Sequence, residues 1–220
     1  MAKKKESTLI NMLVALLVIA AVSGGVLGLV YGVTKDAIAE VDQKKNEAAI
    51  KAVLPLENVT YKADTLKYNY EGVDLTFPCN LAFDANGNFQ GAAVKTSEGG
   101  FGGKIDMMVG FLADGTIKGT SVLSHAETPG LGANMTGKFK DQFVDKNPAS
   151  YKLTVTKDGG DVDAITAATI TSRAFSKAVD KAYQAFEANK AQFMNNAPVE
   201  EIVIETEETI EITEGGTENE

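Results

Sequence analysis

The sequence predicts an α+β protein: one N-terminal transmembrane helix, then a domain outside the cytoplasm with an antiparallel sheet and flanking helices. Three observations lead to this prediction. A long uncharged segment follows a cluster of lysines, short apolar runs are joined in pairs by tight-turn residues, and a long amphipathic run lies near the C-terminus. The chain of 220 residues is long enough for one domain of ordinary size with additional segments.

The transmembrane helix is predicted at residues 9–33, within a stretch from Ser7 to Thr34 that has no charged residue. A helix of about 20 residues crosses the hydrocarbon core of a membrane, so this run is long enough with some tilt. Lys3, Lys4 and Lys5 precede it, and positively charged flanks stay in the cytoplasm. We therefore expect a single-pass protein of the cell (inner) membrane, with residues 1–8 in the cytoplasm and the rest outside.

Two alternatives to this anchor are disfavoured. The apolar core of a cleaved signal peptide spans roughly 7–15 residues, and no small-x-small cleavage site directly follows this longer run. A lipoprotein would need a Cys near the end of the run, and none is there. Gly24, Gly28 and Gly32 recur every fourth residue, a spacing that lets another helix approach closely. The alternative is that glycine is simply common in membrane helices.

Two segments flank the folded domain, which is predicted at residues 56–197. Residues 34–55 read as an amphipathic connecting helix that ends at Pro55. Residues 198–220 form an acidic tail that carries nine glutamates and no Lys or Arg, and its apolar stretch at 202–204 is an alternative strand. The tail accounts for the whole net charge of −9, which argues against nucleic acid as a partner.

The domain is predicted to contain two β-hairpins. Residues 80–94 have the tight-turn pair Asn86-Gly87 between two apolar runs, and residues 104–123 repeat the pattern around Asp114-Gly115. An irregular loop after His125 precedes three further predicted elements. These are a helix near 135–143, a strand at 152–156 and a long amphipathic helix at 171–193.

The stretch at 163–172, Asp-Ala-Ile-Thr-Ala-Ala-Thr-Ile-Thr-Ser, places four hydroxyl side chains at the entry to the long helix. The start of a helix exposes free N–H groups and the positive end of the helix dipole, where phosphate binds well. Small side chains at Ala167 and Ala168 let a bulky group approach the backbone. Plain N-capping is the alternative interpretation. The four hydroxyl residues are Thr166, Thr169, Thr171 and Ser172.

The stretch at 124–134, Ser-His-Ala-Glu-Thr-Pro-Gly-Leu-Gly-Ala-Asn, forms a second candidate site. Pro129-Gly130 predicts a turn, and Leu131 between glycines could lie flat on a ligand ring. His125 and Glu127 are a possible acid–base pair. A structural hydrogen bond is the alternative role for His125.

Glycines dominate a third stretch, Gly-Gly-Phe-Gly-Gly at 99–103, which either brings backbone close to a ligand or forms a flexible turn. It lacks the Lys-Ser/Thr of a P-loop and the GxGxxG fingerprint, so ATP and dinucleotide binding are excluded. With Cys79 and His125 as the sole Cys and His, the chain can form no internal disulfide and no Cys/His metal site. Cys79 is expected to be an ordinary buried residue.

Taken in order after one N-terminal anchor, these three motifs resemble the G subunit of the Rnf electron-transport complex. They resemble less closely the homologous C subunit of the sodium-translocating NADH:quinone reductase. The likeness runs from the anchor to about residue 195. The stretch from Asp163 to Thr169 matches the flavin-transferase acceptor pattern Asp-x-x-(Ser/Thr)-(Gly/Ala)-Ala-Thr. Thr166 replaces the commoner Ser, and Ala167 the commoner Gly.

The resemblance implies an FMN-binding domain in which the FMN phosphate is esterified to Thr169. It implies a flavin transferase that reads the element containing Asp163. It places the other cofactor contacts on the stretches at 124–134 and 163–172. The remaining cofactor-binding residues are therefore predicted as Thr166, Ala167, Ala168, Thr171, Ser172, His125, Glu127, Thr128, Gly130, Leu131 and Gly132.

By the same resemblance, the chain is an electron-transfer subunit of an ion-translocating ferredoxin:NAD oxidoreductase complex in the membrane. Its partners would be the A, B, C, D and E subunits, above all the flavin-bearing D subunit, and it would have no catalytic or metal site of its own. One alternative is the equivalent subunit of a sodium-translocating NADH:quinone reductase. Another is an anchored binding domain without redox chemistry. A soluble flavin reductase is disfavoured by the anchor and by the lack of a nicotinamide fingerprint.

Overall fold

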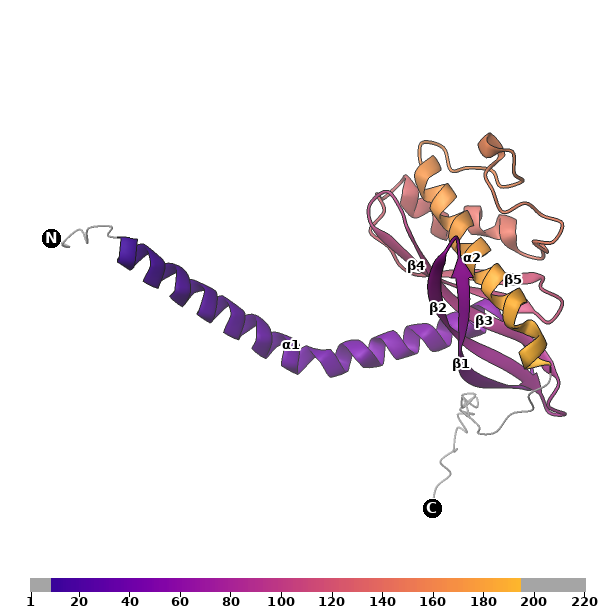
Figure 1. The fold of residues 1–220 in the computed structure, drawn as a ribbon, viewed down its shortest axis with the longest axis horizontal. Coiled ribbons are helices and arrows are strands. Elements are labelled where there is room, and N and C mark those ends of the chain that lie inside the picture. Colours follow the sequence, from indigo (N-terminus) through magenta and orange to yellow (C-terminus); the bar gives the residue numbers. More distant parts are fainter. Residues whose placement is uncertain (1–8, 195–220) are drawn as a thin grey trace, which may run out of the picture. The chain divides into compact units, whose positions relative to one another are not determined.

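The computed structural model describes residues 9–194, which divide into two compact units between Ala48 and Ala49. Helix α1 (Leu9–Val53) is continuous (Figure 1). The predicted transmembrane run and connecting helix are thus parts of one helix, which is long and apolar enough to cross a membrane by length and composition. The helix ends at Val53 because Leu54 precedes Pro55, and the residue before a proline is disfavoured in helical conformation.

Within residues 49–194, an antiparallel sheet of five strands follows chain order, β1-β2-β3-β4-β5. Both predicted hairpins are confirmed, and their turn glycines Gly87 and Gly115 have φ of 80° and 91°. Strand β1 was not predicted, because Glu71-Gly72 forms its turn with Glu where Asn or Asp is usual. The strands are β1 (Val59–Tyr70), β2 (Val73–Asp84), β3 (Phe89–Gly99), β4 (Lys104–Leu112) and β5 (Ile117–Ser124).

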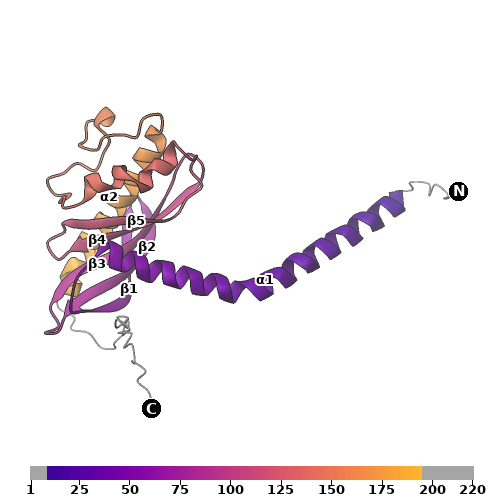
Figure 2. The same ribbon diagram turned by 180° about the vertical axis from the view of Figure 1, so that it is seen from behind.

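One face of the sheet packs against helix α2 (Thr169–Phe193), which lies in front of the strands in Figure 1 and behind them in Figure 2. Successive strand residues point to opposite faces. Phe83, Val109 and Phe111 therefore share this core with Phe175 and Phe186 of the helix. Cys79 is buried in the same core, as expected, and burial raises the pKa of its thiol to about 12.

The alternate residues of the same strands face a second, smaller core. Ala82, Ala93 and Met108 pack there against Ile50 and Val53 at the end of α1. Gly110 lies on this face, where an added Cβ would collide with the carbonyl group of Val53. The sheet is thus covered on both sides, and Ala49, Ile50, Val53 and Leu54 belong to the hydrophobic interior of the domain.

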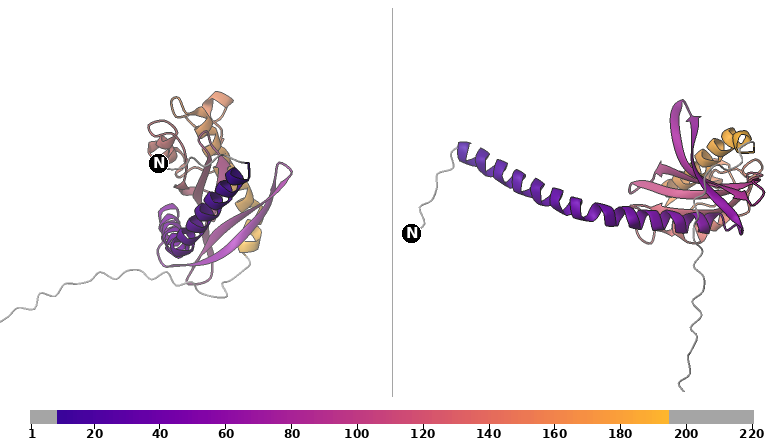
Figure 3. Two further views of the ribbon diagram at one scale, coloured as in Figure 1. Left: turned by 90° about the vertical axis from the view of Figure 1, so that its left-hand side faces the viewer. Right: turned by 90° about the horizontal axis from the view of Figure 1, so that it is seen from below.

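The segment between β5 and α2 differs from the prediction in two places, and it gathers at the end of the domain where α2 begins (Figure 3). The predicted helix at 135–143 is wrong as an α-helix: it forms two short 3₁₀ helices, η1 (Gly132–Thr136) and η2 (Lys138–Phe143). Gly137 separates them, and glycine is a poor residue for a helix interior.

The predicted strand at 152–156 is also wrong. Its residues fold back locally, because Gly159 with φ of 84° turns the chain and Asp161 pairs with Lys152 through backbone and side chain. Only a single bridge joins Val155 to Val162, and η3 (Thr156–Asp158) follows. Helix α2 begins at Thr169, two residues earlier than predicted. The segment predicted to be cytoplasmic, residues 1–8, and the acidic tail with its possible strand fall outside the described residues.

Candidate functional site

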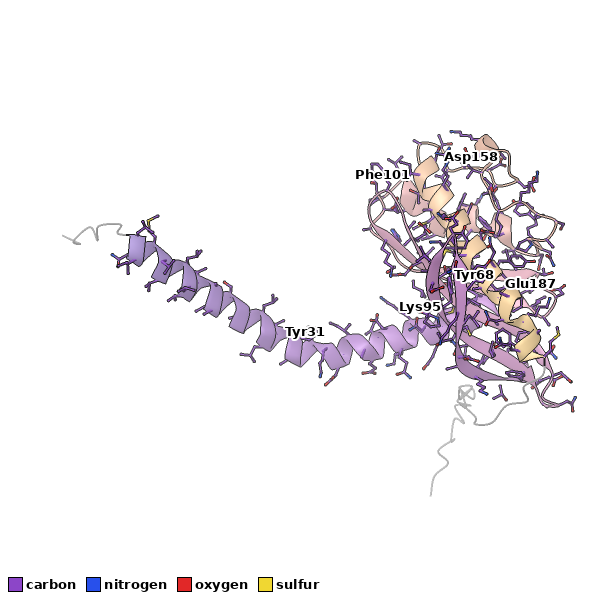
Figure 4. All side chains as sticks on the ribbon, in the orientation of Figure 1. Tyr31, Tyr68, Lys95, Phe101, Asp158 and Glu187 are labelled. Atoms are coloured by element: carbon purple, nitrogen blue, oxygen red, sulfur yellow. The ribbon has the colours of Figure 1, made fainter. Side chains whose placement is uncertain are left out.

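Parts of the three glycine- and hydroxyl-rich motifs line one cavity of about 370 Å³ at the start of α2. This volume falls within the usual range for ligand sites, roughly 300–1,000 Å³. Phe101, at the same end of the domain (Figure 4), comes from the β3–β4 loop. The other lining residues are Glu127, Thr128, Leu131 and Gly132 from the loop after β5, and Ala167, Ala168, Thr169, Ile170 and Thr171 from the helix entry.

Larger hollows occur elsewhere on the domain, but they bring fewer of these motif residues together. The hollow of about 490 Å³ beside β2 and β3 is lined by the ion pair of Glu98 and Lys181, among others. A shallow hollow of about 670 Å³ contains Thr166 but none of the other hydroxyl residues of the acceptor motif. The cavity at the start of α2 is therefore the candidate site.

Glu127 ties the three segments together. Glu127 is buried, with only 5% of its surface exposed. Oε1 accepts a hydrogen bond from the Gly102 N–H at 2.8 Å, and Oε2 accepts one from the Thr171 hydroxyl. Because an unpaired buried carboxylate is costly, these two donors fix the glycine loop and the first turn of α2 relative to the loop after β5.

The four hydroxyl side chains of the acceptor motif have different surroundings. Thr171 donates to Glu127. Ser172 donates to the Ala168 carbonyl at 3.0 Å and accepts from the Ile165 N–H at 2.9 Å. Thr166 is exposed and lies outside the cavity wall. Thr169 alone of the four both lines the cavity and keeps its hydroxyl hydrogen free of a protein acceptor within residues 9–194.

The start of α2 suits an anion. Its N-cap, Ala168, makes no side-chain capping hydrogen bond, and the first turn has no acidic residue. The first N–H groups of a helix have no partner within the helix and carry its positive partial charge. Ala167 has a φ of 60°, a left-handed conformation that costs a residue with a side chain roughly 1–2 kcal/mol. This conformation gives a physical reason for glycine at the same place in the commoner acceptor pattern.

His125 and Glu127 do not form an acid–base pair in this structure. His125 is exposed, and its Nδ1 accepts a hydrogen bond from the backbone N–H of Glu127 at 3.2 Å, while the Glu127 carboxylate is held by Gly102 and Thr171. His125, Gly130, Thr166 and Ser172 lie outside the cavity wall, whereas the other eight predicted cofactor-binding residues line it.

Four residues of the site region were not predicted from the sequence. Phe101 and Ile170 line the cavity, and Lys157 Nζ lies 3.3 Å from Thr169 Oγ1. Gln142 holds the backbone of Asp163, accepting from its N–H at 2.8 Å and donating to its carbonyl at 3.1 Å. Phe101 lies within the glycine-rich motif at 99–103. Lys157 and Gln142 carry no local signal because only the folding of the 132–163 segment brings them there.

The family described as FMN-binding domain matches residues 100–184, a range that includes every residue lining the cavity. The cavity, its apolar side chains and the open helix start suit a flavin with a phosphate group. The chain is therefore an FMN-binding protein of the membrane-anchored class, with α1 as the candidate anchor.

The relatives identify the family more closely. The chain is 35% identical over 202 residues to the G subunit of the ion-translocating oxidoreductase complex of Aliivibrio fischeri, covering 86% of this chain and 93% of that protein. It is 35% identical to the G subunit of the same kind of complex from Methanosarcina acetivorans, covering 83% and 95%. It is also 35% identical to the G subunit of the Na(+)-translocating ferredoxin:NAD(+) oxidoreductase complex of Acetobacterium woodii, covering 78% and 88%. The chain belongs to the family of G subunits of ion-translocating oxidoreductase complexes.

A solved structure with some likeness is that of NqrC from Shewanella oneidensis, with a TM-score of 0.44 and 22% sequence identity. The alignment covers 66% of this chain and 73% of that one.

Proposed function

We propose that this chain is an electron-transfer subunit of an ion-translocating ferredoxin:NAD oxidoreductase complex, and that it carries FMN esterified through its phosphate to Thr169. The observation that supports the ester most directly is the position of the Thr169 hydroxyl. It lies in the cavity wall at the first residue of α2, while the hydroxyls of Thr171 and Ser172 are engaged in buried hydrogen bonds.

The residues around Thr169 supply what such a cofactor needs. The free N–H groups of the first helical turn favour the negative phosphate. Phe101, Leu131 and Ile170 offer apolar surface to the flavin; they are 71%, 42% and 51% exposed although each is a large apolar side chain. When bound, FMN supplies one- and two-electron redox chemistry, and the protein positions it and sets its electrostatic surroundings.

The remaining cofactor-binding assignments differ in their structural support. Glu127, Thr128, Gly132, Ala167, Ala168 and Thr171 belong to the cavity wall. His125, Gly130, Thr166 and Ser172 would act on the flavin only indirectly, through the segments that contain them.

We place the N-terminus in the cytoplasm and the flavin domain outside it, on the basis of the lysines that precede α1. A covalent bond would prevent loss of the cofactor from a domain on that side. The partners would be the A, B, C, D and E subunits, especially the flavin-bearing D subunit, with a flavin transferase needed for maturation. The names of the relatives favour this role over that of the C subunit of a quinone reductase, and the FMN-binding match disfavours a domain without redox chemistry.

The test is in-gel flavin fluorescence after denaturation, with the flavin transferase co-expressed. The parent chain should fluoresce and Thr169→Ala should not. Thr136→Ala, an exposed threonine on η1, is the matched control and should fluoresce like the parent. Fluorescence that survives in Thr169→Ala would refute the attachment site, and a dark parent band would refute covalent flavin altogether.

A further inference from the structure

The side chain of Lys157 lies beside the hydroxyl group that the proposed function assigns to the flavin. Its Nζ is 3.3 Å from Thr169 Oγ1. Lys157 belongs to η3 (Thr156–Asp158), a single turn that neither the acceptor motif nor the two glycine-rich loops include. Any phosphate bonded to Oγ1 would bring its other oxygens within reach of the same ammonium group.

The turn that contains Lys157 is fixed to α2. Asp158 forms a bidentate ion pair with Arg173, with distances of 2.6 Å to Nε and 2.7 Å to Nη2. Figure 4 labels Asp158 at the end of the domain where α2 begins. The bridge between Val155 and Val162 holds the other end of the turn. Because Arg173 is four residues after Thr169 on the same helix, the backbone of Lys157 has a set position relative to the acceptor hydroxyl.

Lys157 is an exposed cation beside the start of α2. A cation near the N-terminus of a helix is repelled by the positive end of the helix dipole. The neighbouring carboxylate, Asp158, is engaged by Arg173, and no carboxylate among residues 9–194 lies within 4.0 Å of Lys157 Nζ. The first turn of α2 adds no acidic residue. A positive side chain and a positive helix end thus meet at the Thr169 hydroxyl, where both favour an anion.

We propose that Lys157 is the counter-charge of the flavin phosphate, pairing with it when the cofactor is attached to Thr169. This inference rests on the proposed function and extends it to a residue outside the three motifs. Glu127, an anion, is the one charged residue among those that line the cavity. The ammonium group of Lys157 and the free N–H groups of α2 would together neutralise the phosphodiester. Lys157 is therefore a binding residue for the phosphate, with no part in electron transfer.

The test compares the stability of full-length protein in detergent with and without attached flavin, produced with and without the co-expressed transferase. The urea midpoint of the domain is measured by proteolysis at increasing urea, and intact mass reports attachment. In the flavinylated form, Lys157→Met should lower the equilibrium constant for folding by about fivefold, as expected of an exposed charge-assisted contact. In the form without flavin, the same change should leave the constant unaltered or raise it, because the repulsion from the helix dipole is removed.

Two control variants accompany Lys157→Met. Lys157→Arg keeps the charge and should show the same difference in urea midpoint between the flavinylated and flavin-free forms as the parent. Lys152→Met removes another exposed lysine of the same segment and should affect both forms equally. A Lys157→Met chain that folds without flavin yet gains no flavin mass, while Lys152→Met does gain it, would also support the assignment.

The contrary outcomes separate the two proposals. If the parent gains flavin mass but Lys157→Met shifts the urea midpoint of both forms equally, or of neither form, the counter-charge role is refuted and the flavin ester stands. If the parent gains no flavin mass in the presence of the transferase, the ester is refuted and the role of Lys157 with it.

Discussion

At the scale of single residues, Glu127 holds together the three segments that line the candidate site. It is buried and bonded to both the glycine loop and the first turn of α2. Gly132 leaves the space that this arrangement requires. A Cβ added there would lie 2.7 Å from the Thr171 hydroxyl and would collide with the Glu127 carboxylate.

Gly132→Ala is expected to destabilise the domain by roughly 1–3 kcal/mol, because the new methyl group would push the Glu127 carboxylate away from Thr171. It should also reduce flavin attachment. Urea unfolding and intact mass measure the two effects.

The matched control is Gly99→Ala, since a Cβ at that position meets no atom within 4 Å. It should behave like the parent within about 1 kcal/mol. A Gly132→Ala chain as stable and as fully flavinylated as Gly99→Ala would contradict the role given to the Glu127–Thr171 contact.

At the scale of elements, the turn between β2 and β3 is held by one carboxylate. Asp84 Oδ1 accepts from the N–H groups of Asn86 and Asn88, and Oδ2 accepts from the side-chain amides of Asn88 and Gln90. The side-chain amide of Asn88 is the largest cause that lowers the pKa of Asp84 below the ordinary 3.8. The turn sequence Asn86-Gly87 and this carboxylate therefore support the same hairpin.

The hairpin contact predicts an acid-dependent loss of stability. A pKa lower in the folded than in the unfolded state means that the contribution is present above pH 3.8 and is lost as the pH falls through the folded value. Asp84→Asn should be less stable than the parent at neutral pH, and the difference should shrink below about pH 4. Urea midpoints measured across this range provide the test.

Glu57→Gln changes an exposed carboxyl outside the hairpins and is the control. An Asp84→Asn difference that stays constant down to about pH 3 would show that the charged carboxylate does not stabilise the turn.

Helix α1 presents a second feature at this scale. A Cβ added at Gly24, Gly28 or Gly32 would meet no atom of this chain within 4 Å. The described part of the chain therefore leaves the glycine face of the helix open, and the packing of a partner helix on it stays a prediction.

At the scale of the whole molecule, the anchor and the flavin domain make one prediction about topology. Lysines precede α1, and positively charged flanks stay in the cytoplasm. A reporter that works only outside the cytoplasm should therefore be active when it is fused to the C-terminus. Replacing Lys3, Lys4 and Lys5 by Glu should reduce the fraction of chains in this orientation. If a reporter that works only in the cytoplasm is active at the C-terminus of the parent chain, the assigned orientation is reversed.

The sequence predicted those parts of the fold that depend on neighbouring residues. The anchor follows from hydropathy and length, and the two later hairpins follow from Asn86-Gly87 and Asp114-Gly115. The β1–β2 turn was missed because Glu71 is unusual at a left-handed position. The strand expected at 152–156 failed because its alternating buried residues, Leu153 and Val155, pack in a local loop instead of a sheet.

By itself the sequence determined the membrane-anchored class, from local hydropathy and length, and it picked out the three motifs of the candidate site by composition and spacing. The flavin assignment came from the family that these motifs resemble. Only the tertiary structure decided which side chains of those motifs meet. It took His125 out of the cavity, buried the hydroxyls of Thr171 and Ser172, and left that of Thr169 at the wall beside Lys157. The physical reason is that hydrogen bonds between distant segments, such as those of Glu127, depend on how the chain folds back on itself and leave no periodic signal in the sequence.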